Sequence, residues 1–432
     1  MALILENRDI FSLVVSNWLT LKDWGHLDTA MCSKELREIY LSYLHSVPFK
    51  LPDGIELNWK KHQSCLQWFA QRHINESRGQ LNVHQNLWEK LLSSTEVDYR
   101  FFLRGVRNLR FLGFSSDFDF HGVAECSKLT QLSLCSVLGA VPSQNKIPSS
   151  LEILHLQNCK IDGNLLAVFS SCQNLKILRL EYVEFLFDKE GNSGVTSTKS
   201  SFISFLQQIQ HLSVLGELNV FLDIVKDMKT SVLSVSLDRA NKNEPETGAL
   251  YTFLRNCPSC RELTLSRMKV DIMKILSSLS LSTSPMNSLS LNNVRMVNEM
   301  DLVTNPSNAH ELGRLAINKL FLSSLVFLDD NILENLITIL KAHGSPLREV
   351  TFSFCSKITD AAYVLLAINY PHLSSVEIED RKDFWNENRI QHISTLFSNV
   401  PKLLIVAWDL WVLESEKRNF STSKKVLFER GT

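Results

Sequence analysis

A short apolar pattern, Leu-x-x-Leu-x-Leu or a close copy of it, recurs along this chain. Its last two apolar positions alternate with polar ones, and this is the period of a β-strand with one buried face. Successive copies begin roughly 20–30 residues apart, which is typical of repeat arrays. The clear copies are Leu129/Leu132/Leu134, Leu151/Leu154/Leu156, Leu175/Leu178/Leu180, Cys260/Leu263/Leu265, Met286/Leu289/Leu291, Ile317/Leu320/Leu322, Leu347/Val350/Phe352, Leu373/Val376/Ile378 and Leu403/Val406/Trp408.

Between the copies, the apolar spacing changes from that of a strand to that of a helix. Residues 163–172, for example, carry Leu165, Leu166, Val168 and Phe169 at helical spacing. One strand and one helix bury little apolar surface alone, whereas stacked neighbours share one continuous core. We therefore predict an α/β solenoid over residues 105–432, with a parallel inner sheet, outer helices and about twelve repeats.

The register is less clear between residues 186 and 250, where the copies lie further apart. Two further copies are expected there, Leu215/Leu218/Val220 and Val232/Val235/Leu237.

The copy at residues 347–362 resembles the leucine-rich repeat family. Its run Cys355-Ser-Lys-Ile358-Thr-Asp-Ala is similar to the cysteine-containing subtype common in F-box proteins. This resemblance implies a horseshoe whose concave face binds a protein. A continuous ladder of side chains bonding the loop backbone is not expected, because elsewhere the position after the strand is Val137, Val183, Met268, Val294 or Leu325.

Residues 1–45 do not follow the repeat, and their apolar spacing predicts a small helical unit that ends with a helix over 35–44. The run from Ile10 to Cys32 resembles an F-box, although Asn7 and Arg8 stand where the family usually has Leu-Pro. The resemblance implies docking on the adaptor of a cullin ubiquitin ligase. The candidate adaptor-binding residues are Phe11, Val15, Trp18, Leu19, Leu21, Trp24 and Leu27. Alternatively, these helices only cap the array, which needs similar apolar residues.

Residues 46–104 join the two parts. Large apolar residues such as Trp59, Trp68 and Trp88 lie on either side of an expected strand at Gln80–Val83. We interpret this segment as an atypical capping repeat, because it holds too many large apolar residues to stay solvated.

The composition limits the partners. The chain has 432 residues, of which 44% are apolar and 21% charged, with a net charge of −1. Such a balance argues against nucleic acid as an obligate partner. The longest apolar runs are too short to span a membrane, and residues 1–9 lack the layout of a signal peptide. Nine scattered cysteines then indicate reduced thiols and an intracellular protein, cytoplasmic or nuclear.

Catalytic motifs are not found in the sequence. It lacks a glycine-rich phosphate loop, a Gly-x-Ser-x-Gly elbow and a His-Glu-x-x-His pair. Cys257 and Cys260 have metal-like spacing without a second pair, and Cys260 fills an apolar repeat position, so a core role is favoured. We predict no catalytic residue, no cofactor and no metal site, and hence no enzyme.

A partner is expected on the strand positions that face away from the helices. The candidates are His155, Arg179, Phe321, Glu349, Glu377, Glu379 and Asp409. The C-terminal members are acidic, which favours a basic partner, although a merely solvated face is the alternative. Phe321 is either a contact anchor or a sign that the register slips there. The sequence thus predicts a non-catalytic protein-binding module, first as the substrate-recognition subunit of an SCF-type ubiquitin ligase and second as a plain repeat scaffold.

Overall fold

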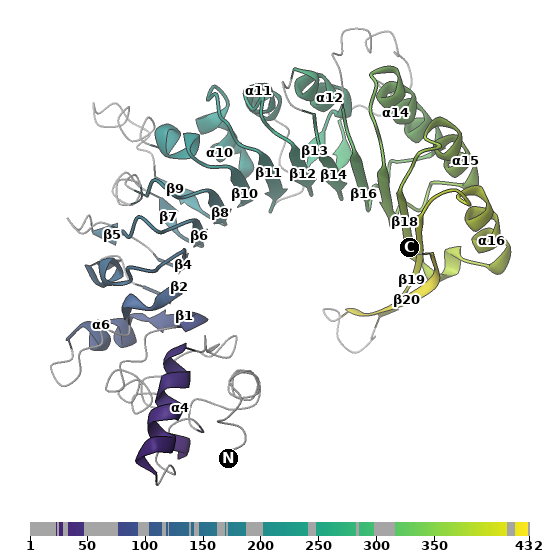
Figure 1. The fold of residues 1–432 in the computed structure, drawn as a ribbon. Helices are drawn as coiled ribbons and strands as arrows, with labels where there is room; N and C mark the ends of the chain where they lie inside the picture. The colour runs from purple at the N-terminus through teal and green to yellow at the C-terminus, as the bar shows by residue number, and fades with distance from the viewer. Residues whose placement is uncertain are drawn as a thin grey trace. The chain divides into compact units, whose positions relative to one another are not determined.

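The computed structural model forms two compact units, Met1–Ile209 and Gln210–Thr432 (Figure 1). It describes residues 23, 26–28, 33–46, 77–93, 103–114, 118–119, 121–137, 140–141, 147–161, 169, 172–186, 202–240, 248–281, 285–297, 316–412 and 420–430.

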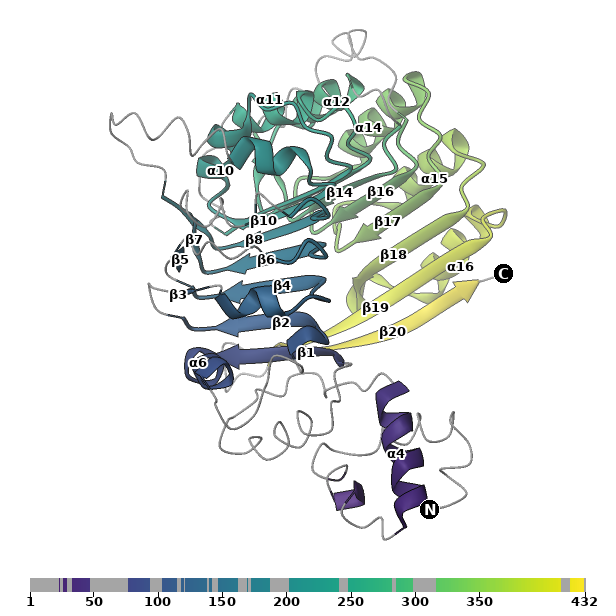
Figure 2. The ribbon, with the colours of Figure 1, turned by 60° about the vertical axis from the view of Figure 1, so that its left-hand side comes forward.

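The first unit contains a parallel sheet with the order β1-β2-β4-β6-β8, whose strands lie side by side in Figure 2. The expected strand at Gln80–Val83 falls inside β1. The principal elements are α4 (Lys34–Ser46), β1 (Ser77–His84), α6 (Gln85–Ser93), β2 (Val106–Leu112), η1 (His121–Glu125), β4 (Gln131–Cys135), β6 (Ile153–Gln157) and β8 (Ile177–Glu181). Four short strands form two further pairs, β3 (Phe118–Asp119) with β5 (Ala140–Val141) and β7 (Lys160–Ile161) with β9 (Glu184–Phe185).

The second unit repeats a strand-then-helix pattern, and its helices lie on one face of its sheet (Figures 1 and 2). Its strands run parallel from β10 to β19, and β20 then pairs antiparallel with β19. The strands are β10 (His211–Gly216), β11 (Ser234–Arg239), β12 (Glu262–Ser266), β14 (Ser288–Asn292), β16 (Lys319–Ser323), β17 (Glu349–Ser353), β18 (Ser375–Arg381), β19 (Lys402–Val412) and β20 (Phe420–Arg430), with the short pair β13 (Lys269–Val270) and β15 (Arg295–Met296). The helices are α10 (Leu218–Val225), α11 (Ala249–Arg255), α12 (Ile272–Ser280), α14 (Asp330–Ala342), α15 (Asp360–Asn369), η3 (Lys382–Phe384) and α16 (Glu387–Leu396).

The recurrent pattern supplies the core of both units. In β16 and just before it, for instance, Ile317, Leu320 and Leu322 are each at most 1% exposed. Helix α14 starts where the Asp329 carboxylate accepts a hydrogen bond from the backbone N–H of Ile332 at 2.9 Å. The predicted α/β fold, with a parallel sheet and helices, is therefore confirmed.

Two of the predicted copies are wrong in register. In the last parallel strand, Leu403 and Ile405 lie opposite Val376 and Ile378, so the inward residues are not Val406 and Trp408. The run from Leu403 to Trp408 is apolar throughout, and it therefore offers no alternation to fix the register.

The second wrong copy is Leu215/Leu218/Val220. The inward residues of β10 are Leu212 and Val214, whereas Leu218 and Val220 belong to α10. The copy Val232/Val235/Leu237 is confirmed, because all three side chains are buried.

A left-handed residue follows most of the repeat strands. Ser324, for example, has φ 55°, and its N–H donates to the carbonyl of Ser353, which ends the next strand, at 2.7 Å. The ladder of backbone hydrogen bonds therefore continues one residue beyond most of these strands. The residues in this conformation are Gly113, Ser136, Asn158, Tyr182, Arg267, Asn293, Ser324 and Phe354.

The side chain that follows this turn bonds the loop backbone only at two cysteines of the described loops. The thiol of Cys159 donates to the carbonyl of Leu134 at 3.2 Å, and that of Cys355 donates to Leu322 at 3.3 Å. The position holds a buried apolar residue in several other repeats, as at Val294. The expected lack of a continuous ladder thus agrees with the described loops.

Candidate functional site

The second unit presents a sheet face on which none of the described helices lies, and we call it the open face (Figure 2). Pairing aligns its outward side chains in rows across the strands. The central row over the C-terminal strands is Ser290, Phe321, Thr351, Glu377 and Leu404. Phe321 therefore lies in register on the open face, and the alternative of a register slip there is wrong.

A second row adds hydroxyl and carboxylate groups. It runs through Ser323, Ser353, Glu379 and Val406. The Ser353 hydroxyl donates to a Glu379 carboxylate oxygen at 3.1 Å, which fixes that side chain on the face. Both strand neighbours of Glu377, by comparison, are uncharged.

Glu349 belongs to a third row, and its charge is already compensated. The Lys319 ammonium lies 2.9 Å from its carboxylate, with the two side chains 36% and 37% exposed. The acidic character of this face therefore comes from Glu377 and Glu379 rather than from Glu349.

Two aromatic rings lie at the carboxyl-terminal edge of the same strands. The ring centroids of Phe354 and Trp408 are 6.3 Å apart with an interplanar angle of 47°. Both side chains are half-buried, as are those of Phe321 and Leu404. We call Phe321, Phe354, Glu377, Glu379, Leu404 and Trp408 together the acidic-aromatic patch.

A further carboxylate stands next to this patch in sequence. Burial raises the pKa of Asp380, and the charges of Arg389 and Arg381 partly oppose that rise. Arg389 is itself held at 2.9 Å by Asp360. Asp380 therefore belongs to a half-buried charge group that includes Arg381 and Arg389.

The sequence did not point to Phe354, Leu404 or Trp408. Phe354 occupies a turn position that carries no apolar period, and the other two were misassigned with the register of β19. For the same reason Asp409 does not hold the position equivalent to Glu377 or Glu379, and its side chain is outside the described residues.

His155 and Arg179 lie next to each other on neighbouring strands of the first unit. The His155 Nε2 atom is 3.1 Å from the Glu181 carboxylate. Burial lowers the pKa of His155, and Glu181 partly offsets this effect. Arg110, which the sequence analysis missed, lies in the same row and donates to Cys135 Sγ at 3.1 Å and to Gln157 Oε1 at 3.2 Å. The repeat copy Val106/Leu109/Phe111 in the sequence could have indicated that Arg110 lies on the outward face of this strand.

Little of the predicted adaptor-binding surface can be located. Leu27 is half-buried, whereas Phe11, Val15, Trp18, Leu19, Leu21 and Trp24 lie outside the described residues. The predicted helix over 35–44 is confirmed as part of α4. Its Arg37 guanidinium donates to both carboxylate oxygens of Asp28, at 2.7 and 3.0 Å.

The described residues contain no group of three or more His, Cys, Asp or Glu side chains that could hold a metal ion. Cys257 and Cys260 are each 1% exposed, so their predicted core role is confirmed. Burial raises the pKa of the Cys260 thiol to about 11, and such a thiol is a poor nucleophile at neutral pH. Within the described part of the chain, no helix has both the length and the apolar character needed to cross a membrane.

The strands of this chain that carry the Leu-x-x-Leu-x-Leu pattern pair in parallel, and helices pack on the sheet face opposite to the open face. This arrangement is a leucine-rich repeat fold. No protein-family model matches the chain, and no curated protein matches it either.

Several solved structures resemble the chain. The leucine-rich repeat-containing protein LegL7 from Legionella pneumophila covers 74% of this chain and 97% of its own, at 13% identity and a TM-score of 0.36. A chain in the octameric complex of Latrophilin 3, Unc5D and FLRT2 (LRR) covers 72% and 86%, at 12% identity and a TM-score of 0.33. The leucine-rich repeat domain of APL1 covers 83% and 85%, at 14% identity and a TM-score of 0.28. At such identities, nothing that these proteins bind is transferred to this chain.

Proposed function

We propose that this chain is a non-catalytic protein-binding scaffold whose acidic-aromatic patch binds a basic, partly apolar segment of a partner protein. The alignment of Phe321, Glu377 and Leu404 in one row of the open face is the observation that carries this proposal. Aromatic anchors supply most of the affinity at protein interfaces, and carboxylates add steering and selectivity. The patch offers aromatic side chains and carboxylates on the neighbouring strands β16 to β19.

The arrangement suits lysine or arginine side chains that lie beside apolar ones. Glu377 has uncharged strand neighbours, so an incoming cation does not compete with an internal ion pair there. Glu379 is held by Ser353, and this reduces the entropy lost when a partner binds.

The test compares the partners captured by the full chain and by Glu377→Lys/Glu379→Lys, using affinity purification and mass spectrometry. We expect the charge-reversed variant to lose a basic partner that the wild type retains. The matched control is Asp227→Lys/Glu334→Lys, which makes the same charge change at two exposed positions outside the patch. Capture that is identical for all three chains contradicts the proposal.

We further propose a place for this scaffold, as the substrate-recognition subunit of an SCF-type ubiquitin ligase. The support is the resemblance of residues 10–32 to an F-box, together with the helix α4 that follows it. In this arrangement the N-terminal helices dock on the adaptor and the patch holds the substrate.

A pull-down of the full chain with the purified adaptor tests this role. We expect association at micromolar concentration and its loss in Trp18→Ala/Trp24→Ala, with Glu377→Lys/Glu379→Lys as the control that still associates. If the wild type does not associate, the N-terminal helices are only a cap and the chain is a repeat scaffold without a ubiquitin role.

A further inference from the structure

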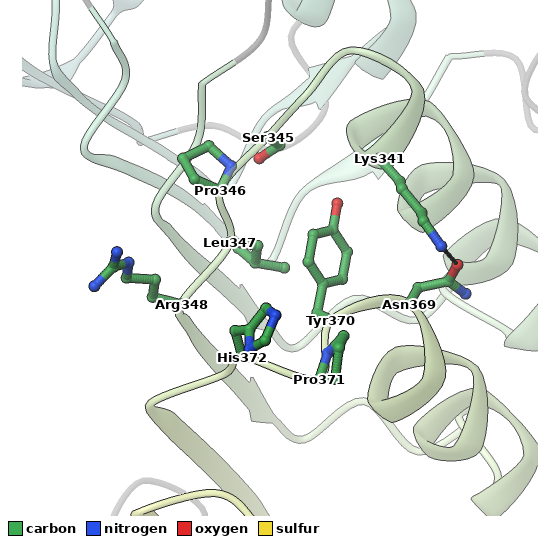
Figure 3. A pocket seen from close by; sticks show the side chains of 9 residues that line it. All are labelled: Lys341, Ser345, Pro346, Leu347, Arg348, Asn369, Tyr370, Pro371 and His372. Carbon is green, nitrogen blue, oxygen red and sulfur yellow. Dashed lines mark hydrogen bonds between the residues drawn. The ribbon is translucent and has the colours of Figure 1, made fainter.

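A second candidate site lies in the second unit, where the chain leaves α14 and α15 and enters β17 and β18. A pocket of 450 Å³ opens there between the two loops (Figure 3). Its apolar lining consists of Pro346, Leu347, the Tyr370 ring and Pro371. Its charged lining residues are Lys341 and Arg348, both basic, with no carboxylate among the lining residues, and the His372 imidazole adds a polar group.

The carboxyl end of α14 at this pocket opposes an anion less strongly than an uncapped helix end would. The carboxyl end of a helix is partly negative because its last carbonyls lack partners. After α14, Gly344 has φ 71°, and its N–H bonds the Lys341 carbonyl while the Ser345 N–H bonds that of Leu340. These two bonds form a Schellman cap, which occupies the exposed carbonyls.

Near the end of α15, two carbonyls accept hydrogen bonds from the residues that follow them. The Asn369 side-chain amide donates to the Leu365 carbonyl at 2.9 Å, and the Tyr370 N–H donates to that of Leu366 at 2.9 Å. The cations around the pocket are therefore not needed to satisfy these carbonyls.

Lys341 is held in place without being neutralised. Its ammonium donates to the Asn369 side-chain oxygen at 2.9 Å, and that partner is a neutral amide. Elsewhere in this unit, ordered cations meet carboxylates, as Lys319 meets Glu349 and Arg389 meets Asp360. An ordered but uncompensated charge beside a pocket favours an incoming anion.

The hydroxyl group of Tyr370 adds a donor that has no partner. The Tyr370 side chain is 8% exposed, and its oxygen makes no hydrogen bond within the described part of the chain. Burial raises the pKa of Tyr370 to about 12, so the group keeps its proton at neutral pH. A buried donor left unpaired is unfavourable, and an acceptor that reached it would supply the missing hydrogen bond.

We infer that this pocket binds an acidic peptide segment of a partner protein, with an apolar side chain in the pocket and carboxylates flanking it. Lys341 and Arg348 lie on opposite sides of Tyr370 in Figure 3, so the order acidic, apolar, acidic fits the lining. This site lies outside the acidic-aromatic patch and prefers the opposite charge. It therefore does not depend on the proposed function.

The first experiment is a selection from a random peptide library displayed on phage, with the full chain immobilised. Before the selection, phage that bind the variant Lys341→Glu/Arg348→Glu are removed from the library. We expect enriched sequences with a large apolar residue between Asp or Glu residues. If no such sequences are enriched, the inference is wrong.

The second experiment measures the affinity of one enriched, fluorescein-labelled peptide by anisotropy. We expect Lys341→Glu/Arg348→Glu to weaken binding about tenfold or more and Lys341→Gln/Arg348→Gln to weaken it less. Raising NaCl from about 50 mM to about 300 mM should weaken binding to the wild type, because screening acts on exposed charges.

Two controls separate this site from other surfaces. Lys229→Glu/Arg255→Glu makes the same charge change at exposed positions of the same unit, and Glu377→Lys/Glu379→Lys alters only the patch. Both should bind the peptide as the wild type does. Equal loss in the Lys229/Arg255 control contradicts a specific pocket and indicates nonspecific charge attraction.

Discussion

Single thiols contribute to this fold because they are both small apolar groups and weak donors. Cys159 and Cys355 are buried and bond carbonyls of the preceding repeat. Burial raises the pKa of each to about 11, well above the value near 8.5 of an exposed thiol. Both therefore remain protonated in the folded chain at pH values where the unfolded chain loses these protons.

This difference predicts a loss of stability at alkaline pH. A raised pKa in the folded state means that the stabilisation is complete below the unfolded pKa and declines as pH rises toward the folded one. We expect each thiol to contribute a loss of about 1–2 kcal/mol in the free energy of unfolding between about pH 7.5 and about pH 10. Urea unfolding under reducing conditions measures it. Cys159→Ala/Cys355→Ala should show a shallower decline, and an unchanged decline contradicts the explanation.

Several repeat strands are followed by a turn whose left-handed geometry is unfavourable for the residue type that occupies it. Ser324 has φ 55°, a conformation that costs non-glycine residues roughly 1–2 kcal/mol. The hydrogen bond from its N–H to Ser353 retains it there. The backbone strain is thus located at Ser324, the first residue after the strand, rather than within the strand.

Replacing Ser324 tests this point at the scale of one turn. Ser324→Gly should change the free energy of unfolding by between about 0 and +1 kcal/mol, because relief of strain competes with the greater freedom of unfolded glycine. Ser324→Val should cost about 1–2 kcal/mol, since a β-branched residue fits this region poorly. Thermal unfolding compares the two, and a valine variant as stable as the glycine variant contradicts the strain.

The sequence predicts strand interiors well where apolar and polar residues alternate, and poorly elsewhere. Alternation in β16 and β18 placed Phe321, Glu377 and Glu379 on the open face correctly. The uninterrupted run from Leu403 to Trp408 fits either register, and only pairing with β18 decides it. The basic pocket was not predictable, because Lys341 and Arg348 come from a helix end and a loop that no periodicity relates.

At the scale of the whole molecule, a stack of repeats needs a closed end. β20 pairs antiparallel along β19, from Leu403 opposite Arg430 to Val412 opposite Phe420. Strand β19 is long and largely apolar in sequence, so an open edge there would attract another chain. The antiparallel strand is thus the element that ends the parallel sheet of the second unit.

Removing the residues after Val412 should therefore convert the chain from a monodisperse species into higher oligomers. Size-exclusion chromatography with light scattering measures the change at several concentrations, because association through an exposed edge rises with concentration. A charged residue on an exposed strand opposes edge pairing, so Leu404→Lys in the truncated chain should restore part of the smaller species. The same substitution in the full chain should leave its oligomeric state unchanged, since β20 already covers the edge. A truncated chain that stays as monodisperse as the full one would show that β19 needs no cover, and that the repeats beside it carry the end of the stack without a cap.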